Sequence, residues 1–374
     1  MKKKPQYKIL FLAPYPMHCA PSQRLKYEQY YDHFEENGFR VTTSSFISLK
    51  FWKIIYKPGF LFQKFIYTLV GYLRRTIDIL TIRRYDIVYV HLWVTPLGPP
   101  IFEWVVLLLA KRVIYDIDDM IFLGHISKAN RMWFRLKGTK KVTNLMANAD
   151  HVIVCSSQLY DYAKQLNHNV SDISSTINLD EFKVPPRKED NSELVIGWTG
   201  SHSTGKYLHI LDRVLEKLNK EYPFRLVVIG DDQYKHDNLK IDSLPWKRET
   251  EVKDLQQIDI GLYPLPFEDW VYGKSGLKAI TFMSLGIPCV ATAIGANNRI
   301  VEDGVNGYLV KTEMEWTDRL RVLCADKELR REMGIKGRKA VEEEYSTKAN
   351  VDKYLQVLFQ VLDEYSNYRF IKQN

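Results

Sequence analysis

Three carboxylates stand close together at the end of a predicted strand. Asp116, Asp118 and Asp119 directly follow the apolar run 112–115. Open α/β sheets bind ligands at the carboxyl ends of their parallel strands, and unpaired like charges at this spacing are costly. A helix N-cap would use only one of the three, so we expect a functional cluster. His91 ends another apolar run and shares this location, although a lone histidine is more often structural.

Two lysines follow a glycine in the second half of the chain. Lys274 and Lys278 lie one turn apart in a helix that we predict over residues 274–285, beside the free N–H groups of its first turn. Two cations next to a positive helix end suit a diphosphate. A solvated lysine face is the ordinary alternative, but such faces do not normally begin with the Gly-Lys-Ser-Gly of residues 273–276.

Two further turns lead from a predicted strand into a predicted helix. Gly200, Ser201 and Ser203 follow the strand 194–198, and hydroxyls with free N–H groups in such a turn can hold a phosphate. Ser22 and Arg24 follow the first strand, at a helix start that favours an anion. A simple N-cap explains each turn equally well or better, and neither has the Walker A or dinucleotide spacing.

The elements around these residues alternate between short apolar runs and helical patterns, which is typical of parallel sheets covered on both faces. A polar stretch at 178–191 separates two such series, so we predict an α/β fold of two Rossmann-like domains with a cleft between them. The predicted strands are 7–13, 40–43, 87–91, 112–115 and 151–155, then 194–198, 224–229, 258–262 and 288–291; the predicted helices include 24–37, 206–222, 314–344 and 347–368.

Composition limits the class of protein. A chain of 374 residues with 45% hydrophobic and 26% charged residues is globular and long enough for two domains. Its net charge of +8 suits an anionic partner such as a nucleic acid, a membrane surface or a phosphorylated small molecule. The four cysteines lie far apart, which predicts neither a zinc site nor disulfides and indicates a reducing compartment. We find no signal peptide pattern and no membrane span.

Much of the positive charge falls in one segment, residues 46–84. It holds eight basic residues and one acidic residue, Asp78, together with nine aromatic residues. A basic helix with large apolar side chains on its other face is typical of binding to an anionic membrane. The alternative is that the aromatic side chains pack on the sheet. Nucleic-acid binding fits the charge but lacks a recognisable motif, so we expect no nucleic-acid partner.

The region from Gly276 to Val310 resembles the donor-binding signature of glycosyltransferase family 4, the glycosyl transferases group 1. The resemblance implies a GT-B fold and a retaining transfer from a nucleotide diphosphate-sugar, with no cofactor and no metal. It implies an acceptor-binding domain at 1–180, completed by a C-terminal helix at about 352–374, and a donor-binding domain at 190–350. It rests on Gly276-x-Lys278-x-x-Thr281-Phe-Met283-x-x-Gly286-x-Pro288, Gly295, Glu302-Asp303-Gly304-x-Asn306-Gly307 and, less specifically, Pro21–Arg24, Asp116-x-Asp118-Asp119, 149–153, 197–201 and 344–346.

One departure from the family pattern stands out. The family's Glu-x7-Glu pair contacts the sugar and the ribose, but Gly273 and Thr281 occupy its positions here. The resemblance places Asp118 where some relatives have a catalytic histidine, so it would contact the acceptor or stabilise an oxocarbenium-like state, with Asp116 and Asp119 in support and His91 as a second-rank candidate. The expected donor-binding residues are Gly200, Ser201, Ser203, Lys274, Ser275, Gly276, Lys278 and Thr281, and the expected acceptor-binding residues are Ser22 and Arg24.

We therefore expect a glycosyltransferase that works on a lipid-linked or oligosaccharide acceptor in cell-surface polysaccharide or glycoconjugate synthesis. Its expected location is cytoplasmic, on the inner face of the cell membrane, with residues 46–84 on the anionic surface. Two alternatives stay open. The acidic cluster Asp116, Asp118 and Asp119 could hold a divalent metal on the donor, or the missing carboxylate pair could mark a non-catalytic subunit that binds a nucleotide or a sugar.

Overall fold

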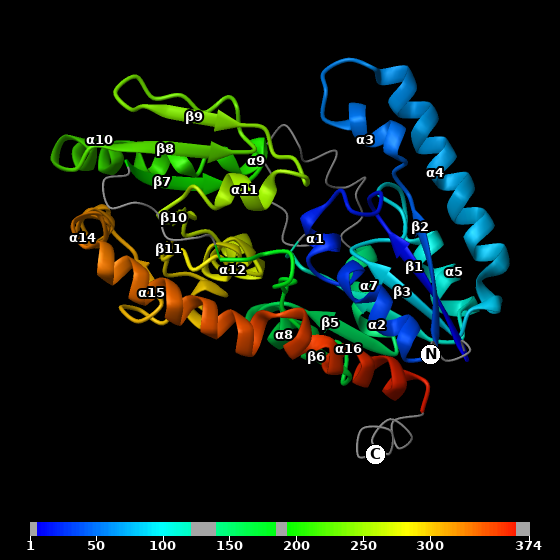
Figure 1. The fold of residues 1–374 in the computed structure, drawn as a ribbon. Helices are drawn as coiled ribbons and strands as arrows, with labels where there is room; N and C mark the ends of the chain where they lie inside the picture. The colour runs from blue at the N-terminus through cyan, green and yellow to red at the C-terminus, as the bar shows by residue number, and fades with distance from the viewer. Residues whose placement is uncertain (1–5, 121–139, 185–192, 364–374) are drawn as a thin grey trace. The chain divides into compact units, whose positions relative to one another are not determined.

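The computed structural model describes residues 6–120, 140–184 and 193–363. They form two compact units, each with its own parallel sheet and its own core (Figure 1). Two predicted parts lie outside the described residues. They are the stretch of the linker with Pro185 and Pro186 and the part of the C-terminal helix beyond residue 363. Unit 1 comprises the chain up to Ser175, Tyr272–Lys274 and the chain from Asn350 onward, and unit 2 comprises Thr176–Val271 and Ser275–Ala349.

Unit 1 contains a six-stranded sheet with the order β2-β1-β3-β4-β5-β6, in which all neighbours are parallel. Because helices cover both faces of such a sheet, its central strands are nearly continuous apolar runs. The strand order reverses between β1 and β3, which is where open α/β sheets bind ligands. The strands are β1 (Tyr7–Ala13), β2 (Phe39–Ser45), β3 (Ile87–His91), β4 (Val113–Asp116), β5 (His151–Val154) and β6 (Val170–Asp172).

Helices cover both faces of this first sheet. On one face, Tyr354 and Leu358 of the C-terminal helix pack with Phe11 and Tyr89 of the sheet. Within the described ranges, no helix is long and apolar enough to cross a membrane. The helices are α1 (Pro21–Arg24), η1 (Glu28–Tyr30), α2 (Tyr31–Glu36), α3 (Leu49–Ile55), α4 (Leu61–Thr81), η2 (Ile82–Arg84), α5 (Ile101–Leu109), α7 (Lys140–Asn148), α8 (Ser157–Lys164) and α16 (Thr347–Val361).

Unit 2 repeats the plan with the order β12-β11-β10-β7-β8-β9, again parallel throughout. Its strands are β7 (Leu194–Thr199), β8 (Phe224–Ile229), β9 (Ile241–Leu244), β10 (Ile260–Tyr263), β11 (Cys289–Thr292) and β12 (Gly307–Val310). Its helices are α9 (His202–Gly205), η4 (Leu208–Leu211), α10 (Asp212–Glu221), α11 (Glu251–Leu255), η5 (Asp269–Gly273), α12 (Leu277–Ser284), α13 (Asn297–Ile300), α14 (Glu313–Ala325), α15 (Lys327–Ala340) and η6 (Val341–Tyr345).

The nine strands predicted from sequence are confirmed to within about two residues at each end. The sequence prediction missed β6, β9 and β12, and all three lie at an edge of their sheet. An edge strand has one neighbour and contacts less of the core, so it needs no long apolar run to form. The α/β fold of two parallel sheets is confirmed.

Three helices predicted as continuous are broken in the structure. The predicted helix 24–37 is replaced by α1, a turn, η1 and α2, and the predicted helix 206–222 becomes η4 and α10. The predicted helix 314–344 divides at Asp326, whose side chain accepts a hydrogen bond from Leu329 N at 2.8 Å and so caps α15. A buried or capping polar side chain explains the first and third breaks, because helical periodicity alone does not register tertiary partners.

Helix α15 touches the backbone that follows α12 through a glycine. A Cβ added to Gly334 would lie 1.9 Å from the carbonyl oxygen of Gly286, whereas one added to Gly337 would lie 3.2 Å from the flexible Met283 side chain and 3.4 Å from Asn306 O. We expect Gly334→Ala to lower the free energy of unfolding by about 1–3 kcal/mol, as overpacking does. Gly337→Ala, in the same helix, should be neutral or stabilising because alanine is the better helix former. Urea denaturation of both variants tests this, and equal stabilities would contradict the contact.

Candidate functional site

A buried carboxylate lies at the carboxyl end of β4 in unit 1. Asp116 is fully buried and pairs with the ammonium of Lys26, which is buried as well. The hydroxyl of Tyr89 donates a hydrogen bond to the other carboxylate oxygen at 2.6 Å. Burial alone would raise the pKa of Asp116, but Lys26 and the neighbouring His91 outweigh it and hold that pKa below its usual value. The carboxylate therefore stays ionised inside the unit.

The break in the predicted helix 24–37 brings Lys26 to this carboxylate. After α1, the side chain of Glu28 accepts hydrogen bonds from His18 N at 2.8 Å and from the Gln23 amide at 2.9 Å. Gln23 also bonds both backbone groups of Tyr15, at 2.8 and 3.1 Å. The loop that follows β1 is thus fixed by buried side chains rather than by helical hydrogen bonds. A continuous helix would not bury Lys26 and Glu28 together with Gln23 in this way.

Asp118 differs from Asp116 in its surroundings. It is half-buried, and burial together with Asp119 and Asp116 raises its pKa, against the opposing effect of His91 and Lys26. The thiol of Cys155, just beyond β5, donates to the Asp118 backbone carbonyl at 3.4 Å and helps to fix the loop. A partly exposed carboxyl with a raised pKa can exchange a proton, and in its ionised form it can stabilise a developing positive charge.

His91 lies below this loop and has no exposed surface. Its Nδ1 is 3.6 Å from Asp116 Oδ2, too far for a hydrogen bond, and its ring meets that of Tyr27 edge-on with centroids 5.2 Å apart. In this structure His91 cannot touch a substrate directly. It contributes to the electrostatic surroundings of Asp116 and Asp118, which is the role of a positioning residue.

The third carboxylate, Asp119, pairs with Lys274 at 2.7 Å, and each side chain exposes about 30% of its area. Both residues belong to unit 1, as does Gly273, where a Cβ would lie 2.6 Å from Met120 N. Only glycine allows this close approach. The sequence analysis treated the three carboxylates as unpaired, and this is wrong for Asp116 and Asp119, since each has a lysine partner.

The two lysines predicted on one helical face are also placed differently. Helix α12 begins at Leu277, because Gly276 has a left-handed φ of +70° and ends the preceding turn. Lys274 therefore precedes the helix, and only Lys278 lies in its first turn. The prediction of a shared helical face is wrong for this reason. Ser275 and Gly276 lie in the turn between the two lysines.

Lys278 rests on aromatic rings in unit 2. Its ammonium is 4.4 Å from the ring centroid of Trp198 and 5.5 Å from that of Tyr263. Trp198 is fully buried in β7 and Tyr263 ends β10, so the cation stands where the strand order of this sheet reverses. Thr281, one turn further along α12, is buried and donates its hydroxyl proton to Leu277 O at 2.8 Å.

The turn after β7 packs against the turn after β8. A Cβ on Gly200 would meet the Trp198 ring at 2.4 Å, and one on Gly230 would meet Gly200 O at 2.0 Å. Ser201 N donates to Thr204 Oγ1 at 3.1 Å, and Ser201 forms a reciprocal capping box with Thr204. The N-cap interpretation of this turn is thus present in the structure. The side chain of Ser203 lies outside the described residues.

The two expected acceptor-binding residues lie in α1 of unit 1, Ser22 in its first turn and Arg24 at its end. Ser22 is half-buried, whereas Arg24 exposes only 5% of its area. Within the described ranges, no group of three His, Cys, Asp or Glu side chains is arranged to hold a metal ion. A metal at the acidic cluster would have to compete with Lys26 and Lys274 for two of its carboxylates.

Sequence reasoning missed three residues that shape this site, namely Lys26, Tyr89 and Cys155. Lys26 falls within a predicted amphipathic helix, where a lysine is expected in water, and Tyr89 and Cys155 read as ordinary core residues of apolar runs. The available signal was Asp116 at the end of an apolar strand, because a buried carboxylate requires a cation from elsewhere in the chain. This signal does not specify which lysine or arginine supplies the charge.

Comparisons with known proteins agree on a fold and an enzyme class. Residues 193–326 match the family model described as Glycosyl transferases group 1. N-acetyl-alpha-D-glucosaminyl L-malate synthase from Bacillus anthracis is 31% identical over 94 residues, so the match spans 25% of this chain and 25% of the length of that relative.

Two solved structures share the architecture over almost the whole chain. Sucrose-phosphate synthase (tll1590) from Thermosynechococcus elongatus has a TM-score of 0.68 at 17% identity, covering 96% of this chain and 100% of that one. Anabaena Alr3699/HepE in complex with UDP-glucose has a TM-score of 0.65 at 15% identity, covering 95% and 100%. Such identities show the fold alone and confirm the predicted GT-B class. The family match over residues 193–326 points to the glycosyltransferases.

The surroundings of Asp118 predict that its negative charge lowers the stability of the folded protein. An ordinary aspartate has a pKa of about 3.9, and burial raises the pKa of Asp118, so the folded protein holds the ionised form at a cost. We expect Asp118→Asn to raise Tm at neutral pH. The gain should shrink as pH falls through the raised pKa and vanish below about pH 4, where the carboxyl is protonated in both states.

Thermal denaturation between acid and neutral pH measures this difference. Asp119→Asn is the matched control, because it removes a charge that Lys274 already balances and should not raise Tm. A lower Tm for Asp118→Asn at neutral pH would mean that stabilising partners hold this carboxylate ionised.

Proposed function

We propose that this protein is a retaining glycosyltransferase that moves a sugar from a nucleotide diphosphate-sugar to a lipid-linked or glycan acceptor in cell-surface polysaccharide or glycoconjugate synthesis. The observation that carries the proposal is the family match over residues 193–326, which contains Gly200 and Lys278. The solved HepE structure, whose fold this chain shares, holds UDP-glucose. Unit 2 is the donor-binding unit in this proposal.

The chemistry assigned to unit 2 is stabilisation of the leaving diphosphate. Negative charge develops on that group as the glycosidic bond to it breaks, and preorganised cations and N–H groups lower the barrier without moving. Lys278 is held on Trp198 and Tyr263 at the first turn of α12, whose N–H groups add a partial positive charge. Because the aromatic faces hold its ammonium in place, little entropy is lost when the phosphate binds.

The chemistry assigned to unit 1 centres on Asp118. Its carboxyl is partly exposed and its raised pKa suits proton exchange with an acceptor hydroxyl, while its ionised form could stabilise the oxocarbenium-like centre. Asp116, Lys26 and His91 stand behind it and set its electrostatic surroundings. Asp119 holds Lys274, so a diphosphate that uses Lys274 must compete with this carboxylate.

The proposed place of action is the cytoplasmic face of the cell membrane, where the basic segment 46–84 would meet anionic lipid.

One observation favours the alternative of a non-catalytic binding subunit. Gly273 and Thr281 replace the expected carboxylate pair, and in the structure Gly273 packs on Met120 while the Thr281 hydroxyl bonds its own helix. Donor binding without turnover over a broad panel of acceptors would favour this alternative.

The lysines should act on the donor diphosphate. We expect Lys278→Ala to weaken binding of a nucleoside diphosphate by about 1.5–3 kcal/mol, the loss of a charge-assisted bond. Lys274→Ala should weaken binding too, and Asp119→Asn, which removes the carboxylate that pairs with Lys274, should strengthen it. Isothermal titration with UDP and GDP measures all three.

Arg319→Ala provides the matched control for the titration, because Arg319 also rests on an aromatic ring, 4.8 Å from the centroid of Tyr308, and is outside the proposed donor site. It should bind the diphosphate like the wild type. If Lys278→Ala also binds with unchanged affinity, the assignment of this lysine to the donor is wrong.

Asp118 should act after the donor has bound. We expect Asp118→Asn, which keeps the shape and removes the charge, to bind nucleoside diphosphate with wild-type affinity and to lose sugar transfer. The readout is release of the nucleoside diphosphate from a panel of nucleotide-sugars with lipid-linked and oligosaccharide acceptors. Transfer at the wild-type rate would make the acidic cluster structural.

A further inference from the structure

Helix α4 exposes a long apolar face to solvent. Its apolar side chains follow helical spacing along the outward face, where Leu61, Phe62 and Leu80 expose 80, 74 and 79% of their area. A surface helix of a globular protein normally turns such a stripe toward the core. The remaining exposed apolar residues of α4 are Phe65, Ile66, Leu69, Val70, Leu73 and Ile77.

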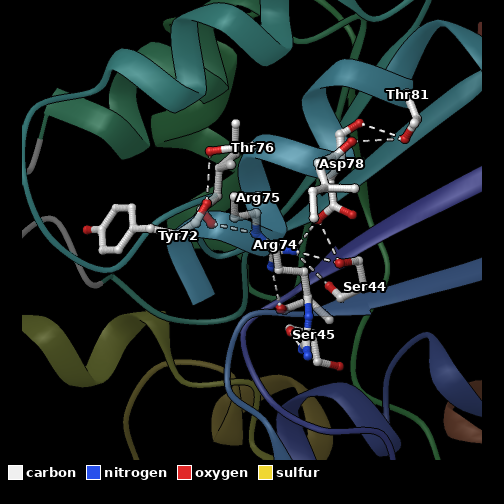
Figure 2. A network of polar contacts seen from close by, with 11 residues as sticks. Ser44, Ser45, Tyr72, Arg74, Arg75, Thr76, Asp78 and Thr81 are labelled. Atoms are coloured by element: carbon white, nitrogen blue, oxygen red, sulfur yellow. Dashed lines mark hydrogen bonds and ion pairs between the residues drawn. The ribbon is translucent and has the colours of Figure 1, made fainter. Parts of the chain in front are cut away.

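The inner face of α4 carries buried charged groups (Figure 2) beside Tyr67, Tyr72 and Ile79, which pack on the core. Arg75 has no exposed surface and donates to Val94 O at 2.9 Å and Ala13 O at 2.7 Å. It also donates to Asp78 at 2.9 Å and to Ser44 O at 3.0 Å. These bonds tie the helix to the ends of β1 and β2 and to the loop after β3. If α4 rotated to bury its apolar stripe, Arg75 would leave these acceptors, and buried polar groups would lose their hydrogen bonds.

Close packing fixes the rotation of α4 as well. A Cβ on Gly71 would lie 2.6 Å from the ring of Phe46, so this ring meets the bare backbone of the helix. The Phe46 ring also meets that of Tyr72 edge-on, with centroids 5.3 Å apart. Phe46 and Tyr72 belong to a small core cluster, which confirms the core alternative for part of the segment 46–84. The outward stripe therefore cannot turn inward.

Helix α5, beside α4, also combines an exposed apolar face with a buried charge, although its Val106 packs in the core. Its Glu103 is fully buried and accepts hydrogen bonds from Thr95 N at 3.0 Å and Thr95 Oγ1 at 3.1 Å, with Lys141 at 3.7 Å. Its neighbour Trp104 exposes 54% of its area, and Ile101 and Leu108 are exposed on the same face. The two helices touch through the rings of Tyr72 and Phe102, with centroids 5.6 Å apart.

The margin of this surface is basic. Between residues 46 and 84 the acidic residue is Asp78, which faces inward and bonds Arg75 and Ser44. Exposed lysines and arginines precede and follow α4 in the chain, and this segment has no exposed carboxylate. They are Lys50, Lys53, Lys57, Arg83 and Arg84.

We propose that the outward faces of α4 and α5 dock on an anionic membrane by inserting their apolar side chains among the lipid headgroups. An exposed apolar stripe with a basic margin complements the acyl boundary and the negative surface of such a membrane. A second copy of this chain is the poorer occupant, because a two-fold contact would bring the two basic margins together. The proposal deepens the membrane role in the proposed function and rests on it only for the identity of the acceptor.

The apolar stripe, more than the charge, should dominate the binding. The test is co-sedimentation of the full chain with phosphatidylcholine vesicles and with vesicles containing phosphatidylglycerol, at low and high salt. We expect the variant Phe62→Gln, Leu69→Gln, Leu73→Gln to lose more than about tenfold in partitioning, since three large side chains no longer leave water. Glutamine is a good helix former, so α4 should stay folded.

The matched control changes three exposed apolar residues of unit 2, Ile210→Gln, Met314→Gln and Ile335→Gln, and should bind vesicles like the wild type. A variant with Lys50, Lys53 and Lys57 changed to Glu should lose binding to the anionic vesicles at low salt. Circular dichroism verifies the fold of each variant. Vesicle binding needs no donor or acceptor, so its outcome is independent of the transferase assays and of the UDP titration.

Three results would overturn the proposal. The wild type fails to bind anionic vesicles, or the α4 variant binds them as well as the wild type does. The third is a wild-type dimer in light scattering that the α4 variant converts to a monomer, which would identify the surface as an interface between copies of this chain.

Discussion

A carboxylate buried at the end of a parallel strand has to be neutralised by a cation from another part of the chain, and the organisation of unit 1 follows from this requirement at Asp116. Leaving such a charge unpaired would cost several kcal/mol. Lys26 can pair with Asp116 because the segment after β1 does not form one continuous helix. The buried side chains of Gln23 and Glu28 then fix the loop, and the buried pair sets the field in which Asp118 titrates.

The same physics governs α4. Arg75 is a second buried cation, satisfied mainly by backbone carbonyls at the strand ends and by Asp78. Because these polar groups take up much of the inner face, most of the apolar residues of the helix lie on its outer face. Glu103 with Lys141 and Thr95 has the equivalent effect on α5. Two buried polar networks thus generate an exposed apolar surface, because a buried charge costs more without partners than a leucine costs in water.

In unit 2 the constraint is steric. The left-handed Gly276 starts α12 where Lys278 can lie on Trp198 and Tyr263, and it separates Lys274 from the helix. Two lysines four residues apart therefore have different partners, one a pair of aromatic rings and the other a carboxylate. The first cation is held by a weak, polarisable surface, and the second is balanced by a full charge. A diphosphate that binds Lys274 must therefore displace a carboxylate, whereas one that binds Lys278 need not.

The sequence by itself determined the alternation of strands and helices, the two sheets and the segments that carry the candidate chemistry, because apolar periodicity and glycine-rich turns are local properties. It predicted neither the edge strands β6, β9 and β12 nor the breaks in three helices. The sequence was enough to select Asp118 as a candidate. It did not show that the pKa of Asp118 is raised while that of Asp116 is lowered. That difference depends on Lys26, ninety positions from Asp116 along the chain, and the outward face of α4 depends on carbonyl groups of three separate strands and loops around Arg75. Only the tertiary structure decides which polar groups are buried together, since the cost of burying a charge is set by partners that are distant in sequence.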